Sequence, residues 1–250
     1  LNVMFTYVFL FIIFGAFLKA TGATRFIIEF AKRVFGRSPG GPAKVAVLSS
    51  GLMGSLSGSA VANTATTGTF TIPMMRSAGF KPVTAAGIQA AASSGGALMP
   101  PVMGAGAYMM LEIVEPPVTY FEIIRAALIP AILYYLSLLL IVHFHARRAD
   151  TTSIANAEKS TAKKAQGGSI GFDGFVFAAA LGSLILFLVL GYTAFRAVTL
   201  SLVTIILTSS FHHSTRLKIG TTINGLVKAA RDVVPLVSAA ACVGIIIGIV

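Results

Sequence analysis

The stretch that decides the fold is GSLSGSAVANTATTGTFTIPMM, residues 54–75. It fills most of a run of 31 residues without a charged side chain, between Lys44 and Arg76. As one helix this run would be roughly 46 Å long. That is too long for a hydrocarbon core of about 30 Å and too short for two complete crossings. We therefore expect a re-entrant hairpin over residues 44–77, which enters the membrane, turns at mid-depth near 58–63 and leaves on the same side.

The composition indicates that the whole chain is an integral membrane protein. Of 250 residues, 56% are hydrophobic and only 11% are charged, whereas soluble domains carry about 25% charged residues. The net charge of +11 comes mostly from Lys and Arg in short segments between apolar runs. This is the placement of orientation charges in membrane proteins, and it argues against a nucleic-acid partner. The single cysteine, Cys242, excludes an internal disulfide and a cysteine-built metal site.

A second uncharged stretch, residues 82–111, contains AAASSGGALMPPVMGAGAYMM at positions 90–110. Its far end carries glutamates rather than basic residues, so one crossing over 82–113 is the economical interpretation. Two glycines and two prolines between Ser93 and Pro101 would interrupt the backbone hydrogen bonds there. We therefore expect a transmembrane helix that is broken at mid-depth.

The remaining apolar runs predict further helices that cross the membrane or lie on it. An amphipathic pattern at 23–35 indicates a helix in the interface plane, and a short interfacial piece at 119–126 is expected to lead into a crossing at 127–144. Other spans are expected at 1–18, 175–190 and 197–211, with a second amphipathic helix at 219–230 and a final span after Pro235. In this all-α polytopic topology only Arg125 and Arg196, of 19 basic residues, lie outside the cytoplasm.

The mid-depth segments predict a site made of neutral oxygen atoms. No Asp, Glu, Lys or Arg lies near the centre of an expected span, so a proton relay has no candidates. Hydroxyls, one amide and interrupted backbone suit a hard monovalent cation such as Na⁺, and helix N-termini suit an anion. We expect a Na⁺ site between Ser57, Asn63 and Gly95. Ion or substrate binding is expected of Ser55, Ser57, Gly58, Ser59, Asn63, Thr64, Ser93, Ser94, Gly95, Gly96, Pro100 and Pro101.

These residues also have plainer interpretations. The small ones could simply let helices pack closely, and the two prolines could form a plain kink or a designed break. The amide of Asn63 is costly at mid-depth unless it has a partner, so it is expected either to bind a ligand or to stabilise the hairpin tip. The string Gly54–Gly58 lacks the spacing of a nucleophile elbow, and no base lies at that depth, so an enzyme is not expected.

The two quoted strings closely resemble the permease of tripartite ATP-independent periplasmic (TRAP) transporters, especially the fused large-subunit type of the TAXI subgroup. The resemblance implies an elevator-type, inverted-repeat transporter that couples Na⁺ entry to uptake of an organic acid, with no other cofactor. The acid would be delivered by a periplasmic solute-binding protein, and the permease would lie in the inner membrane of a bacterium or archaeon.

The same resemblance implies how the chain is organised. Residues 1–147 would form the first repeat, 148–172 a cytoplasmic linker, and 173–250 the opening helices of the second repeat, whose hairpin is expected after Val250. Two other functions stay open at this point. One is a Na⁺-coupled organic-acid carrier of similar hairpin architecture that works without a binding protein, and the other is a membrane scaffold that transports nothing.

Overall fold

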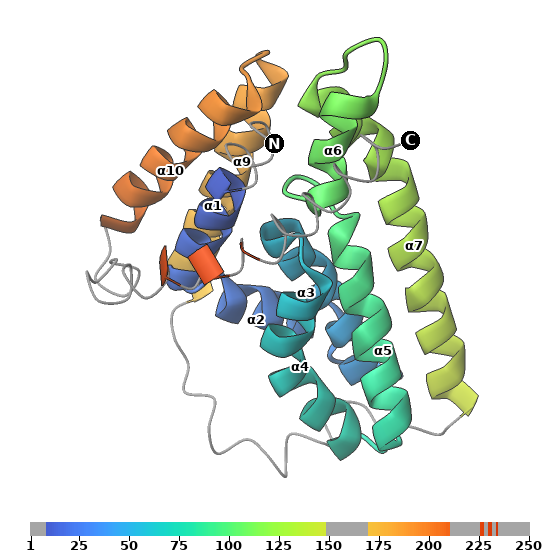
Figure 1. The fold of residues 1–250 in the computed structure, drawn as a ribbon. Helices are drawn as coiled ribbons and strands as arrows, with labels where there is room; N and C mark the ends of the chain where they lie inside the picture. Colours follow the sequence, from blue (N-terminus) through green and yellow to red (C-terminus); the bar gives the residue numbers. More distant parts are fainter. Residues whose placement is uncertain (1–8, 149–169, 211–225, 228–229, 232–233, 235–250) are drawn as a thin grey trace. The chain divides into compact units, whose positions relative to one another are not determined.

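The computed structural model describes residues 9–148 and 170–210, together with a few positions between 226 and 234 (Figure 1). Every regular element in these residues is helical, which confirms the all-helical prediction for this part of the chain. The helices are α1 (Phe9–Ala20), α2 (Ala23–Phe35), α3 (Gly41–Ser57), α4 (Ala60–Ser77), α5 (Pro82–Ser94), the 3₁₀ helix η2 (Gly95–Ala97), α6 (Ala105–Ile113), α7 (Tyr120–Arg148), α9 (Ile170–Val189) and α10 (Ala194–Ser210).

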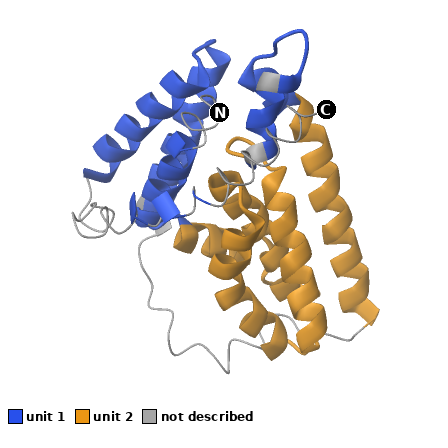
Figure 2. Ribbon diagram, viewed as in Figure 1, with its two compact units in different colours: residues 1–23, 104–125, 171–250 blue, residues 24–103, 126–170 orange. Residues whose placement is uncertain are grey.

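The chain divides into two compact units, each built from segments that are not consecutive (Figure 2). Unit 1 comprises residues 1–23, 104–125 and 171–250, and unit 2 comprises 24–103 and 126–170. The expected boundaries of the repeat and most of the expected linker fall on, or depend on, residues outside the described part. They therefore stay predictions, as does the amphipathic helix expected at 219–230.

A helical hairpin occupies the segment whose length argued for one. Helix α3 ends at Ser57, and Gly58 adopts the left-handed conformation with φ 58°, in which its N–H donates to the carbonyl of Gly54. Ser59 then caps α4, since its hydroxyl accepts a hydrogen bond from the Ala62 N–H. The tip is therefore the pair Gly58 and Ser59, a glycine that tolerates positive φ followed by a helix-capping serine.

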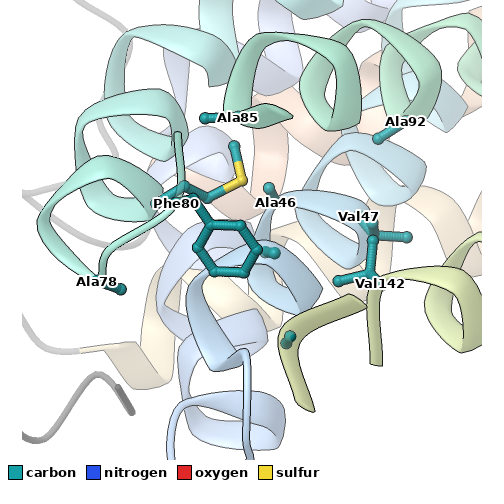
Figure 3. Packing of buried hydrophobic residues seen from close by; sticks show 10 residues of the cluster. Ala46, Val47, Ala78, Phe80, Ala85, Ala92 and Val142 are labelled. Carbon is teal, nitrogen blue, oxygen red and sulfur yellow. The ribbon is translucent and has the colours of Figure 1, made fainter. Parts of the chain in front are cut away.

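Small side chains let the helices of unit 2 approach closely. The buried cluster in Figure 3 joins α3, the end of α4 and the turn that follows it, α5 and the last turns of α7. Six of its ten members are alanines: Ala43, Ala46, Val47, Met75, Ala78, Phe80, Ala85, Ala92, Val142 and Ala146. Close contact between small residues is the usual way in which membrane helices associate, because lipid supplies no hydrophobic force between them.

Helix α2 has the bounds that the amphipathic pattern at 23–35 predicts. Its Ile27 and Ala31 are fully buried, whereas Phe30 and Val34 are 40% and 51% exposed. Part of the apolar face therefore packs within the protein, and part is open to the surroundings. Its position at a membrane interface stays a prediction.

The second uncharged stretch is interrupted where glycine and proline predict an interruption. Helix α5 ends at Ser94, η2 continues for one tight turn, and residues 98–104 form no regular helix before α6 begins at Ala105. Whether α5 and α6 are two halves of one crossing stays a prediction, because they belong to different units.

Helix α7 differs from the expectation of an interfacial piece at 119–126 followed by a separate span at 127–144. It is one helix of 29 residues. Thr119 and Glu122 explain its start, because the backbone N–H and the hydroxyl of Thr119 donate to Glu122 Oε2 at 2.7 and 2.9 Å, and the Glu122 N–H donates to Thr119 Oγ1 at 3.3 Å. This is a capping box, which starts the helix at the position where the interfacial piece was expected to begin.

Among the described residues, α7 is the one helix that is both long enough and apolar enough to cross a membrane, and α1 and α2 meet the same test only when taken together as a bent pair. In unit 1, α9 and α10 are shorter apolar helices near the spans expected at 175–190 and 197–211. An aromatic cluster of Phe11, Tyr108 and Tyr120 joins α1, α6 and the start of α7 within this unit.

Candidate ion and substrate site at the hairpin and the helix break

Asn63 joins the two arms of the hairpin. Its side chain is 1% exposed, and its Nδ2 donates a hydrogen bond of 2.7 Å to the backbone carbonyl of Ser50 on α3. Its Oδ1 lies 3.4 Å from the hydroxyl of Thr67, one turn further along α4. The amide therefore stabilises the hairpin, which is one of the two roles that its sequence position predicts.

The helix break lies directly against the hairpin. A Cβ atom added to Gly96 would lie 2.8 Å from Gly54 Cα and 2.9 Å from Asn63 Nδ2, and one added to Gly54 would collide with the backbone of Gly96. Only residues without a side chain allow this approach of two backbones. The structure thus brings Asn63 and Gly96 together, whereas Gly95, the glycine of the predicted Na⁺ site, faces the rings of Tyr134 and Tyr135.

The hydroxyls near the tip bind mainly to their own helices. Ser57 Oγ donates to the carbonyl of Met53 at 3.1 Å, within its own helix. The same local pattern holds for the remaining serine and threonine candidates on α3, α4 and the exposed face of α5. Ser55 donates to Leu52, Thr64 to Ala60 and Ser94 to Ala90.

The candidates in the break itself are placed differently. Ser93, Gly95, Gly96 and Pro101 are buried, whereas Pro100 is half-buried. The predicted set is therefore divided between a buried part, which includes Asn63, and a more accessible part at the tip, at Ser94 and at Pro100.

Two helix ends meet at the tip. Helix α3 ends there with its C-terminal carbonyl groups, and α4 begins there with its N-terminal N–H groups. The last carbonyls of a helix carry partial negative charge and favour a cation, whereas the first N–H groups favour an anion. The tip therefore offers both polarities within a few residues and without an ionised side chain.

A buried glutamine below the tip was missed by the sequence analysis, which singled out only one amide. Gln89 on α5 is fully buried and hydrogen-bonds to side chains of α3, α4 and α5: Ser50, Thr67, Thr71 and Ser93. Its signal in the sequence was an amide in an otherwise small and apolar helix, four residues before Ser93 and therefore on the same helical face.

Two tyrosines of α7 were also missed. The hydroxyls of Tyr134 and Tyr135 donate to the carbonyls of Ala91 and Ala92 at 2.8 and 2.9 Å. These carbonyls belong to the last turn of α5, where the helix tightens into η2 and the Gly95 N–H is shared between the carbonyls of Ala91 and Ser93. A Cβ added to Gly95 would collide with the Tyr134 ring, so the pair also fits against the glycines of the break.

The chemistry of this region is that of neutral donors and acceptors. In the described part of the chain, every buried side-chain nitrogen and oxygen has a hydrogen-bond partner. No group of three or more His, Cys, Asp or Glu residues there could hold a metal ion. The oxygen atoms that this region offers are those of backbone carbonyls, hydroxyls and amides.

Comparison with known proteins gives the family. The profile described as "Tripartite ATP-independent periplasmic transporter, DctM component" matches residues 2–250. The 2,3-diketo-L-gulonate TRAP transporter large permease protein YiaN of Escherichia coli is 41% identical over 90 residues, which are 36% of this chain and 20% of that protein. The C4-dicarboxylate TRAP transporter large permease protein DctM of Pseudomonas aeruginosa is 31% identical over 137 residues, or 55% of this chain and 31% of that protein.

These alignments cover about a fifth to a third of the length of the two relatives. The family profile, in contrast, covers nearly every residue of this chain, and it includes both strings on which the resemblance to TRAP permeases was based. The chain therefore belongs to the DctM component family of the tripartite ATP-independent periplasmic transporters.

Proposed function

We propose that this chain is part of the permease of a Na⁺-coupled TRAP transporter that imports an organic acid delivered by a periplasmic solute-binding protein. The finer features implied by the resemblance belong to the same proposal: an inverted-repeat, elevator-type mechanism, a fused large subunit and the TAXI subgroup. The names of two relatives specify 2,3-diketo-L-gulonate and C4-dicarboxylate. Both are carboxylates, which supports an organic acid as the substrate class.

The observation that carries the proposal is the contact between the hairpin and the break, where Gly54 and Gly96 meet beside the Asn63 amide. Interrupted helices side by side expose carbonyl groups that a cation can use, and such interruptions are typical of transporter sites. All the polar groups at this contact are neutral. A monovalent cation can be bound and released there without proton transfer, whereas a proton-coupled mechanism would need a titratable group.

Uptake measurements in proteoliposomes test this proposal. The purified transporter should take up organic acid when a Na⁺ gradient is imposed and its binding protein is present outside, and it should fail when choline replaces Na⁺. Uptake that follows a pH gradient and ignores Na⁺ would refute the coupling. Uptake without the binding protein would favour the simpler carrier, and the absence of any uptake in the complete assembly would favour a scaffold.

Asn63→Ala tests the site within that assay. It should raise the Na⁺ concentration that gives half-maximal uptake, because it removes the amide beside Gly96. Thr69→Ala is a matched control, since Thr69 lies on the same helix and its exposed hydroxyl donates only to the carbonyl of Thr66 among the contacts in the described chain. If the two variants had the same Na⁺ dependence, Asn63 would have no part in ion binding.

A further inference from the structure

Gln89 lies at the centre of a polar cluster that connects three helices. Its Nε2 is 3.1 Å from Ser50 Oγ on α3, 2.7 Å from Thr67 Oγ1 on α4 and 2.9 Å from Ser93 Oγ on α5. Its Oε1 accepts a hydrogen bond of 2.6 Å from Thr71 on α4. The side chains of Gln89, Thr67 and Ser93 are all 0% exposed.

Both ends of the Gln89 amide, its oxygen and its NH₂ group, are engaged in hydrogen bonds. Two N–H groups face three hydroxyl oxygens, so at least one N–H is shared between two of them. The hydroxyls of Ser50 and Thr67 also lie 3.2 Å from each other. A fully connected network of this kind fixes the relative positions of its members, because displacing any one of them leaves another buried group without a partner.

Each partner of Gln89 leads to a component of the candidate site. The backbone carbonyl of Ser50 accepts a hydrogen bond from the Asn63 amide, and Ser50 lies one turn before Gly54. Thr67 donates to the Asn63 carbonyl at 2.8 Å. Ser93 lies two residues before Gly95, at the start of the break. Gln89 therefore holds, from the buried side, all three segments that meet around Asn63 and Gly96.

Packing alone would fix these positions poorly. The buried faces of α3 and α5 carry mainly alanine, glycine and serine, and such smooth surfaces can slide or rotate against each other without a large loss of contact. Directional hydrogen bonds fix the register of one helix against another where the shapes of their surfaces do not. Single buried polar residues have this role in other helical assemblies. If the side chain at position 89 only had to fill space between the helices, methionine or leucine would do so as well as glutamine.

We propose that Gln89 is a positioning residue that fixes the hairpin against the helix break and so maintains the contact between Asn63 and Gly96. Its effect on ion binding rests on the proposed function, whereas its effect on the local structure does not. Gln89→Met keeps nearly the same volume and removes the hydrogen bonds. We expect it to loosen the tip and the break while the other helices keep their structure.

Hydrogen exchange measured by mass spectrometry tests the structural part directly. In the purified transporter, Gln89→Met should accelerate amide exchange about tenfold at residues 55–63 and 95–98, the change expected from losing one to two buried hydrogen bonds. Exchange in α9 and α10 should not change. Ser93→Ala and Thr71→Val, which each remove one hydroxyl from the cluster, should give smaller increases at the same places, and the control Thr69→Ala should give none.

Transport supplies the second readout. Gln89→Met should raise the Na⁺ concentration for half-maximal uptake about tenfold, in line with the local opening, while the maximal rate changes much less. If Gln89→Met fails to fold, Ser93→Ala and Thr71→Val decide the question. The proposal is overturned if none of the folded variants increases exchange at the tip and the break beyond Thr69→Ala. If wild-type uptake ignores Na⁺, the proposed function fails, and the exchange data still decide the role of Gln89.

Discussion

Replacing Gly96 by alanine should separate the hairpin from the helix break. The new methyl group would lie 2.8 Å from Gly54 Cα and 2.9 Å from Asn63 Nδ2, well inside the contact distance of about 3.5–4.0 Å for carbon atoms. Neither neighbour can give way cheaply, because Gly54 contributes its backbone and Asn63 is held by the Ser50 carbonyl at 2.7 Å. The segments must therefore move apart by roughly 1 Å, the difference between these distances.

The expected cost is that of an overpacked core, about 1–3 kcal/mol. Gly87→Ala is the matched control, since Gly87 lies on α5 and an added Cβ there meets nothing within 4 Å. Alanine has the higher helix propensity, so this control should be neutral or stabilising by up to about 1 kcal/mol. The comparison cancels the general effect of replacing glycine and leaves the effect of the collision.

Thermal unfolding of the purified protein, followed by circular dichroism in one detergent, measures the difference. Gly96→Ala should unfold several degrees below Gly87→Ala, and hydrogen exchange should increase at the tip. Gly54→Ala should be destabilising too, and the double variant should lose less than the sum of the single effects, because the first methyl group already opens the gap. Equal stability of Gly96→Ala and Gly87→Ala would show that the two backbones do not meet as described.

Two further predictions concern the support of the break and the topology. Tyr134→Phe and Tyr135→Phe remove the hydroxyls that donate to the carbonyls of Ala91 and Ala92 at 2.8 and 2.9 Å, while the Ala91 carbonyl keeps the Gly95 N–H as a partner. Each change should cost about 0.5–1.5 kcal/mol and raise exchange at 95–98, whereas unchanged exchange in both variants would mean that α7 does not support the break. For topology, with Cys242 replaced, cysteines at positions 38 and 77 should react only with reagents admitted to the cytoplasm, and one at position 119 only from outside. Opposite accessibility of positions 38 and 77 would exclude a re-entrant hairpin.

The hairpin could be predicted from the sequence because its signals are local. The length of the uncharged run limits the number of crossings, and Gly58 followed by Ser59 marks the end of one helix and the cap of the next. The start of α7 was equally readable, since Thr119 and Glu122 have the spacing of a capping box. The segment expected at 119–126 begins at this place, and what the sequence did not show is that it continues as one helix through 127–144.

The polar cluster was not predictable in the same way. Gln89 and Ser50 are 39 residues apart, and Tyr135 and Ala92 are 43 apart. No periodicity within one helix says which residues of another helix will face it, so spacing could flag Gln89 and Ser93 as neighbours but could not supply their partners. The predicted Na⁺ site between Ser57, Asn63 and Gly95 stays a prediction: the Ser57 hydroxyl donates to the Met53 carbonyl, and its oxygen keeps lone pairs that a cation can use.

Beside its buried apolar cluster, the hairpin with α5 has a buried polar cluster and exposed apolar side chains, a combination that is unusual in a water-soluble helical bundle. Hydroxyl and amide groups lie inside, as in Thr67, Thr71 and Gln89, whereas Val61 and Val83 are 80% and 84% exposed. In water this arrangement would place apolar side chains on the surface and would use the interior for groups that water solvates well. In lipid, outward apolar side chains cost nothing, and hydrogen bonds between helices help to hold them together. The buried polar cluster and the exposed valines are therefore both explained by a lipid bilayer around these helices. They support the membrane assignment independently of helix length.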